Sequence, residues 1–181
     1  MPATGIEIER KYLLDEMPAL PEGAEPWQIE QGYLSPWSSP RAADGKGLSS
    51  ADVEFGYGRL RRSVMPDGSV VCTHTVKTGS GLQRAERERV ISQRDFERHW
   101  PRTQGRRLRK TRWRVPHGGV MWEIDDIEQG FMTLAEVELE TPDQAVTAPA
   151  WLAQHIVREV TDDPMYTNSA IAERLTGALK K

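Results

Sequence analysis

Charged residues recur at every second position along several segments of this chain, and this alternation restricts its fold more than any other feature. Side chains alternate between the two faces of a β-strand, so residues two apart share a face. In the first such segment Glu7, Glu9 and Lys11 fall on one face, while Ile6 and Ile8 fall on the other. The pattern therefore predicts an amphipathic strand whose polar face carries two acids and a base.

The same spacing returns down the chain. The later sets are Arg59 and Arg61; Thr73, Thr75 and Lys77; Arg84, Glu86 and Glu88; Lys110, Arg112 and Arg114; Glu123 and Asp125; and Glu136, Glu138 and Glu140. The opposite faces are often apolar, as with Trp122 and Ile124. If these strands close into a barrel, the charged faces point into the lumen and the apolar faces point outward, where helices can cover them. The alternative is an open sheet with one charged face in water.

Eight strands are predicted, near residues 5–13, 27–34, 54–63, 69–77, 84–92, 107–115, 120–127 and 133–140. Tight turns containing Gly separate three pairs of them and favour antiparallel hairpins, at 66–68, 79–81 and 116–119. Ser92 and Asp95 have the spacing of a capping box, which predicts a helix through about Trp100 that ends at Pro101. We therefore expect an α+β fold.

Helices are also predicted in the last part of the chain, at about 149–179. Pro149 suits the first turn of a helix, and an apolar stripe follows at helical spacing, formed by Trp151, Leu152, Ile156 and Val160. We expect this helix to cover the barrel. A final helix is predicted from Asn168 or Ser169 towards Leu179, with inward-facing residues Ile171, Ala172 and Leu175.

Residues 35–53 are rich in Ser, Pro, Ala and Gly and show no apolar periodicity, so they are predicted to form a long flexible loop. A tolerated insertion is the preferred interpretation. The alternative is a lid, in which Trp37, Arg41 and Lys46 fold over a tunnel mouth.

The length indicates one domain over residues 1–181, and the overall charge by itself predicts no partner. Charged residues make up 28% of the chain, but the net charge is only -3, so anion binding must depend on the local arrangement of charge. The basic stretch 102–114 is not expected to bind nucleic acid, because Trp113 falls on the face opposite Arg112 and Arg114.

Cysteine usage and hydropathy bear on the compartment. Cys72 is the only cysteine, which excludes an internal disulfide and suits a reducing environment. No apolar stretch approaches the roughly 18 residues that span a bilayer, and the N-terminal residues contain no apolar run preceded by basic residues. We expect a cytoplasmic protein with no membrane partner, and leave open whether it forms a homodimer.

Several motifs in order resemble the CYTH superfamily, also called triphosphate tunnel metalloenzymes. The first strand matches the family's glutamate-x-glutamate-x-lysine signature, and the later matches are Arg59 and Arg61, HTVKT, RAERE, KTRWR, WEID, AEVELE and EVTDDPMYTN. The resemblance covers nearly the whole chain. It implies an eight-stranded antiparallel tunnel that binds triphosphate-bearing substrates with divalent metal ions.

The resemblance also implies roles for residues of the charged faces. Its metal ligands would be Glu7, Glu9, Glu136 and Glu138, whose oxygens suit Mg²⁺ or Mn²⁺. Its triphosphate ligands would be Lys11, Arg59, Arg61, Lys77, Lys110, Arg112 and Arg114. Candidates for a second metal or for positioning water are Glu88, Glu123 and Asp125. Arg84 and Glu86 are interpreted as structural partners of the other charges.

The expected activity is metal-dependent hydrolysis of inorganic triphosphate to pyrophosphate and phosphate by a metal-activated water. Lys11 and Lys77 are the catalytic candidates, moving a proton or stabilising the leaving phosphate. One alternative is hydrolysis or cyclisation of an organic triphosphate, as in thiamine triphosphatases and adenylyl cyclases, with Trp37 or Tyr33 against the organic group. The other is a polyphosphate-binding module without catalysis.

Overall fold

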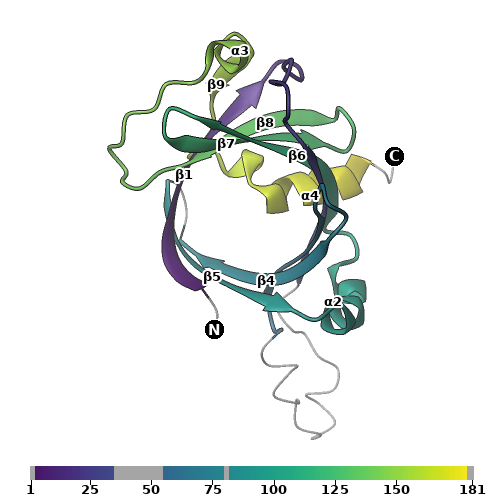
Figure 1. Cartoon of the computed structure of the whole chain (residues 1–181). Helices are drawn as coiled ribbons and strands as arrows, with labels where there is room; N and C mark the ends of the chain where they lie inside the picture. The colour runs from purple at the N-terminus through teal and green to yellow at the C-terminus, as the bar shows by residue number, and fades with distance from the viewer. Residues whose placement is uncertain (1–2, 35–54, 80–81, 179–181) are drawn as a thin grey trace, which may run out of the picture.

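A computed structural model describes residues 3–34, 55–79 and 82–178, in which antiparallel strands are arranged in a ring (Figure 1). The strands are β1 (Ala3–Leu14), β2 (Pro26–Leu34), β3 (Gly58–Val64), β4 (Val70–Thr78), β5 (Gln83–Ile91), β6 (Arg107–His117), β7 (Val120–Ile127), β8 (Met132–Glu138) and β9 (Ile156–Glu159). The helical elements are α2 (Gln93–His99), η2 (Trp100–Thr103), α3 (Ala150–Ala153), η3 (Pro164–Tyr166) and α4 (Asn168–Ala178).

The barrel closes because β1 pairs with two strands along its length. Residues Ala3 to Ile8 pair with β5, and Glu9 to Leu14 pair with β8. The remaining neighbours follow in the order β5, β4, β3, β2, β6, β7, β8, which completes a ring of eight strands with β9 outside it. The predicted eight-stranded antiparallel barrel is therefore confirmed, and β1 and β8 are neighbours as expected.

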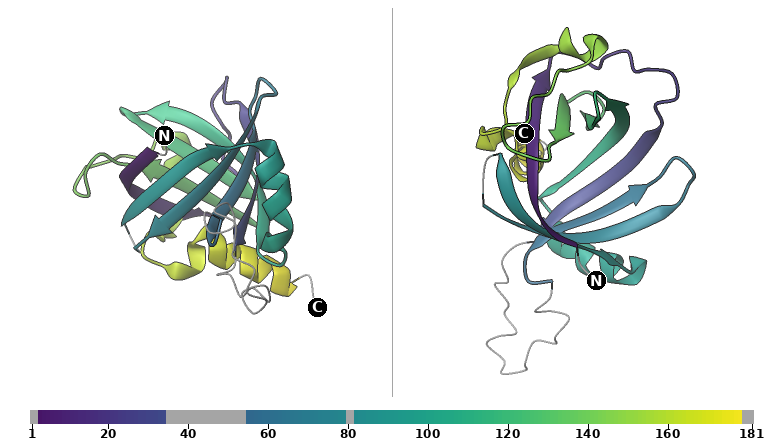
Figure 2. Two further views of the ribbon diagram at one scale, coloured as in Figure 1. Left: turned by 90° about the horizontal axis from the view of Figure 1, so that it is seen from below. Right: turned by 60° about the vertical axis from the view of Figure 1, so that its left-hand side comes forward.

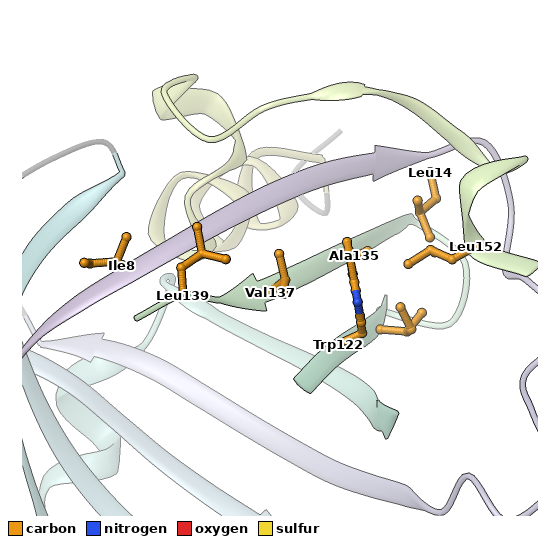
Figure 3. Close-up of a cluster of buried hydrophobic side chains, with 8 residues drawn as sticks. Ile8, Leu14, Trp122, Ala135, Val137, Leu139 and Leu152 are labelled. Carbon is orange, nitrogen blue, oxygen red and sulfur yellow. The ribbon is translucent and has the colours of Figure 1, made fainter. Parts of the chain in front are cut away.

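The outward faces are apolar where other segments cover them. Figure 3 shows one such cluster outside β1, β7 and β8, in which Trp122 and Val137 are fully buried together with Leu152 of α3. A second cluster lies under α2, where Phe96 packs against Leu60 of β3 and the free thiol of Cys72. In these two clusters the apolar outer faces of the strands are buried away from water.

One end of the lumen is closed by α4, which lies across the barrel in Figure 1 and at the end of the strands in Figure 2. Ile171 and Ala172 of this helix are fully buried against inward-facing Leu108, Ile127 and Leu134. The predicted inward face of the last helix, which includes Leu175, is thus confirmed. The lumen is apolar at this end and charged further along.

The helix predicted from Pro149 through Val160 was wrong in extent. Only Ala150–Ala153 is helical, and Ile156–Glu159 forms β9, which pairs with Tyr12 to Leu14 of β1. The register of β5 on β1 ends at Ile8, so the edge of β1 beyond it needs new partners for its backbone groups. The following segment supplies them, since Val160 N–H donates to Lys11 O at 2.8 Å.

The remaining connections mostly follow their predicted chemistry. Ser92 Oγ accepts a hydrogen bond from Asp95 N–H at 3.0 Å, which confirms the capping box, and α2 ends at His99 just before the turn that contains Pro101. The third strand begins at Gly58, later than predicted. The loop predicted at 35–53, with its lid alternative, lies outside the described residues. No helix among those residues is long and apolar enough to span a bilayer.

Leu152 is expected to secure the four-residue helix α3 against the barrel, because its side chain is fully buried. We predict that Leu152→Ala lowers the free energy of unfolding by about 2–5 kcal/mol, through lost apolar contact and the cavity left behind. Urea denaturation followed by tryptophan fluorescence measures this. The control is Val157→Ala in neighbouring β9, where the side chain is 57% exposed and the change should stay within about 0.5 kcal/mol. Equal losses in both variants would contradict the packing role.

Candidate active site

The barrel encloses a cavity of about 720 Å³ whose walls carry most of the sequence-predicted site residues. All four predicted metal ligands line it, namely Glu7, Glu9, Glu136 and Glu138. Five of the predicted triphosphate ligands do so as well, namely Lys11, Arg59, Arg61, Lys77 and Arg112. Glu88 and Glu123 also line the cavity, whereas Lys110, Arg114 and Asp125 are not among its lining residues.

A chain of ion pairs runs along the wall formed by β6, β7, β8 and β1. Lys110 Nζ lies 2.5 Å from Asp125 Oδ2, and Arg112 Nη2 lies 2.6 Å from the same oxygen. Arg112 Nη2 is also 2.5 Å from Glu136 Oε2, and Glu136 Oε1 is 2.8 Å from Lys11 Nζ. Each charge in the chain therefore has a neighbour of opposite sign.

Lys110 and Asp125 form the inner end of this chain. Both side chains are fully buried, with 0% of their surface exposed. Burial would raise the pKa of Asp125, but the charges of Arg112 and Lys110 hold it below its ordinary value. Burial and the neighbouring Arg112 lower the pKa of Lys110 to about 8. Since Asp125 grips both Nε and Nη2 of Arg112, this pair fixes the guanidinium that faces the cavity.

A second group of ion pairs joins β1 to β4 and β5. Arg84 Nη2 lies 3.1 Å from Glu7 Oε2 and also contacts Glu9 Oε1. Lys77 Nζ lies 2.5 Å from Glu7 Oε2 and 2.9 Å from Glu86 Oε2. The first-strand glutamates are therefore held by basic side chains of this chain itself.

Glu138 is the exception among the predicted metal ligands. It is exposed, and no basic side chain in the described part of the chain pairs with it. Glu138 is exposed as a residue, but partial burial of its carboxyl raises its pKa, as does repulsion from the nearby carboxylates of Glu7, Glu123, Glu86 and Glu9. Because Glu138 lies beside other carboxylates and has no basic partner among the described residues, additional positive charge at this position would be stabilising.

The donor set fits a hard divalent cation, although its side chains now hold basic residues. Across the described ranges, no three His, Cys, Asp or Glu side chains are gathered closely enough to hold a metal ion together. Glu9 and Glu138 are nevertheless directly paired residues of β1 and β8, so their side chains share the lumen face. Carboxylate oxygens are the ligands that Mg²⁺ and Mn²⁺ prefer. Glu7, Glu9 and Glu138 could thus hold such an ion after a change of side-chain partners.

Arg61 is the basic residue that, like Glu138 among the acids, has no ion-pair partner in the described residues. Its guanidinium donates to Gln31 Oε1 at 3.2 and 3.3 Å, and no carboxylate within the described residues forms an ion pair with it. Burial lowers its pKa to about 10, with further lowering by the charges of Arg59 and Arg112. A buried guanidinium beside other cations is costly without an anion. The site around Arg61 is therefore suited to bind one.

Arg59 and Arg114 occupy the two sides of this arrangement. Arg59 Nη2 lies 3.3 Å from Glu88 Oε2, which in turn accepts from Thr75 Oγ1 at 2.6 Å. Arg114 Nε lies 3.2 Å from Glu123 Oε1, and its side chain is 41% exposed. The two predicted phosphate ligands therefore differ in depth, and only Arg59 lines the cavity.

Sequence reasoning missed Gln31, which supports the cavity wall without lining it, and two lining residues near α4. Gln31 is fully buried and orients Arg61, and its Nε2 donates to Tyr33 Oη at 2.7 Å. Gln31 and Tyr33 share strand parity, which is the signal that could have placed them together on the lumen face. Thr167 and Ser169, at the start of α4, also line the cavity, and no alternation in the sequence marks them.

Comparison with known proteins agrees with this geometry. No family model matches the chain. An inorganic triphosphatase from Nitrosomonas europaea is 34% identical over 173 residues, which cover 92% of this chain and 96% of that protein. This chain belongs to the CYTH superfamily.

Further comparisons place the CYTH chain near bacterial triphosphatases. A crystal structure of an inorganic triphosphatase superposes with a TM-score of 0.53 at 30% identity, covering 92% of this chain and 94% of that one. A second inorganic triphosphatase, from Acetivibrio thermocellus, is 32% identical over 68 residues, which are 36% of this chain and 41% of that protein.

The two members of the buried Lys110–Asp125 pair are expected to differ in how much their removal destabilises the CYTH barrel. Asp125→Asn should lower the free energy of unfolding by about 3–5 kcal/mol, because it leaves Lys110 buried without a counter-charge. Lys110→Met should cost less, because Asp125 keeps its two contacts with Arg112. Urea denaturation of both variants measures the difference.

The double variant Lys110→Met/Asp125→Asn is the control for direct coupling. Its loss of unfolding free energy should be smaller than the sum of the two single losses, since the double variant leaves neither Lys110 nor Asp125 buried without its partner. A loss equal to that sum, or a costlier Lys110→Met, would contradict the assigned pairing.

Proposed function

We propose that this CYTH protein is a metal-dependent enzyme that hydrolyses inorganic triphosphate to pyrophosphate and phosphate. The observation that carries the proposal is Arg61, a lumen guanidinium with no acid partner in the described residues, beside Arg59 and Arg112. Glu138 of β8, which no basic side chain in the described residues pairs with, lines the same cavity. The names of the similar proteins support the same substrate.

The basic residues would bind the chain of phosphates. Arg59, Arg61 and Arg112 offer planar forks that can each hold two phosphate oxygens. Lys77 and Lys11 would add point charges on other sides of the cavity. Lys110 and Asp125 would act through Arg112, because their side chains lie behind it and outside the lining. A direct phosphate contact by Lys110 or Arg114 remains a prediction from the resemblance.

The acidic residues would hold the metal, with Glu7, Glu9, Glu136 and Glu138 as proposed ligands. A bound Mg²⁺ or Mn²⁺ would neutralise phosphate oxygens and supply a water of lowered pKa. Glu88 and Glu123 line the cavity and would orient water or hold a second ion. Asp125 is fully buried and engaged by two cations, which favours the positioning role over a ligand role.

Lys11 would stabilise charge on the phosphates. Burial by itself would lower the pKa of Lys11, but Glu136 and Glu9 raise it above its ordinary value. The ammonium therefore stays protonated at neutral pH, which favours the stabilisation of charge over the donation of a proton to the leaving phosphate. Lys77 is the second candidate for that role. Phosphoryl transfer asks the protein mainly for positioning and charge neutralisation, so no covalent nucleophile is required.

A second candidate substrate is an organic triphosphate. Ile6 and Tyr57 line the cavity although 65% and 56% of their surfaces are exposed, so an organic group could contact them. The hydroxyl of Tyr33, a residue predicted to contact such a group, accepts a hydrogen bond from Gln31. Trp37, the other predicted residue, lies outside the described residues. Assays of phosphate, pyrophosphate and cyclic AMP with triphosphate, ATP and thiamine triphosphate would distinguish these activities from simple binding.

Metal removal tests the acidic half of the site. We predict that phosphate release from inorganic triphosphate requires Mg²⁺ or Mn²⁺ and stops in excess EDTA. Glu9→Gln should lower the rate by about 10²-fold or more, by analogy with loss of other groups that stabilise a transition state. The matched control is Glu140→Gln, a nearby exposed glutamate that does not line the cavity. Wild-type rates in Glu9→Gln would rule out the metal assignment.

Arg61 tests the basic half. Arg61→Gln removes a charge-assisted contact to phosphate and should raise KM for inorganic triphosphate by about 10- to 100-fold, the equivalent of roughly 1.5–3 kcal/mol. Steady-state kinetics at saturating metal measure this. Arg109→Gln is the control, since Arg109 is exposed and does not line the cavity. An unchanged KM in Arg61→Gln would refute triphosphate binding at this position.

A further inference from the structure

Arg84 joins the two glutamates of the first strand. It lies directly opposite Glu7 in the pairing of β1 with β5, and its Nη2 contacts both Glu7 Oε2 and Glu9 Oε1. The Arg84 and Glu9 side chains are each 15% exposed, so the contact is largely shielded from water. This one guanidinium therefore neutralises two carboxylates that the proposed function assigns to a divalent metal ion.

The other cations of the cavity do not bridge this pair. Lys77 contacts Glu7 but not Glu9, and divides its charge with Glu86. Lys11 lies 3.9 Å from Glu9 and much closer to Glu136. Loss of Arg84 would therefore remove part of the neutralising charge from both first-strand carboxylates, and no other described side chain is positioned to replace it.

A metal ion and this guanidinium compete for the same oxygens. Arg84 takes up lone pairs of Glu7 Oε2 and Glu9 Oε1, and its positive charge at these oxygens repels a divalent cation that approaches the same carboxylates. The guanidinium is itself incompletely bonded, because its Nε is buried without a partner in the described residues. Arg84 also lines the cavity, so a displaced guanidinium would stay beside the bound phosphates.

We propose that Arg84 occupies the acidic site of Glu7 and Glu9 until a divalent cation displaces it, and then becomes a ligand of the triphosphate. This inference rests on the proposed function for its ligands. Before metal binds, Arg84 stabilises two lumen carboxylates that would otherwise repel each other. After metal binds, the same charge is available to an anion, so the metal and the substrate are linked through one side chain.

Direct metal binding tests the competition without any turnover. Mn²⁺ affinity is measured on substrate-free protein from the electron paramagnetic resonance signal of free Mn²⁺. Arg84→Met should bind Mn²⁺ about fivefold more tightly than wild type, or more, because the competing cation is gone. Arg84→Lys keeps the charge and should return the affinity towards the wild-type value.

The matched control is Arg59→Met, which removes an equal charge from the same lumen. Arg59 pairs with Glu88 and not with the first-strand glutamates, so its loss should change Mn²⁺ affinity by less than about twofold. An affinity gain in Arg59→Met equal to that in Arg84→Met, or no gain in Arg84→Met, would overturn the inference. If Arg84→Met does not fold, as judged by circular dichroism, Arg84→Gln serves in the same comparison.

Kinetics separate this inference from the proposed function. With saturating Mn²⁺, Arg84→Met should raise KM for inorganic triphosphate about fivefold or more, while Arg84→Lys restores part of the loss. A KM unchanged by Arg84→Met would refute the phosphate-ligand half of the inference. If wild type releases no phosphate but Arg84→Met still tightens Mn²⁺ binding, the proposed hydrolysis fails and the competition stands. If wild type hydrolyses triphosphate and Arg84→Met leaves Mn²⁺ affinity unchanged, the competition fails alone.

Discussion

Charges withdrawn from water must be balanced by neighbouring charges, and the lumen of this barrel is built around that requirement. Removing an ion from water costs several kcal/mol unless a counter-charge and hydrogen bonds replace the lost hydration. Strand register supplies the counter-charges here, because it places Glu7 opposite Arg84, Lys11 opposite Glu136, and Arg112 opposite Asp125. The closed ring of strands thus holds acids and bases together that lie far apart in the sequence.

The departures from balance identify what the lumen lacks. Arg61 has no acid partner in the described residues, and Glu138 has no basic one. One position would be stabilised by an anion and the other by a cation. A triphosphate accompanied by a divalent metal ion provides both, which is why the geometry and the similarity to inorganic triphosphatases support the same proposal.

Much of the fold followed from alternation, because a strand with one charged and one apolar face has few ways to satisfy both. The parity of β1 and β8 correctly placed Glu9 and Glu138 on the lumen side. The segment after Pro149 was misread, since Leu152, Ile156 and Val160 fit a helical stripe as well as a turn followed by a strand. The free edge of β1 decided between them by pairing with β9, and no local pattern records that edge.

The sequence by itself determined which face of each strand a residue occupies, because side chains alternate with a fixed period of two. It did not determine depth along the barrel or the choice of partner. Lys110 and Arg112 share parity, yet one is sealed against Asp125 and the other reaches the cavity. Only the tertiary structure decided this, and it also identified Glu7 and Glu9 as the charges that Arg84 balances. Depth and pairing depend on register and closure, which arise from contacts between strands distant in the chain.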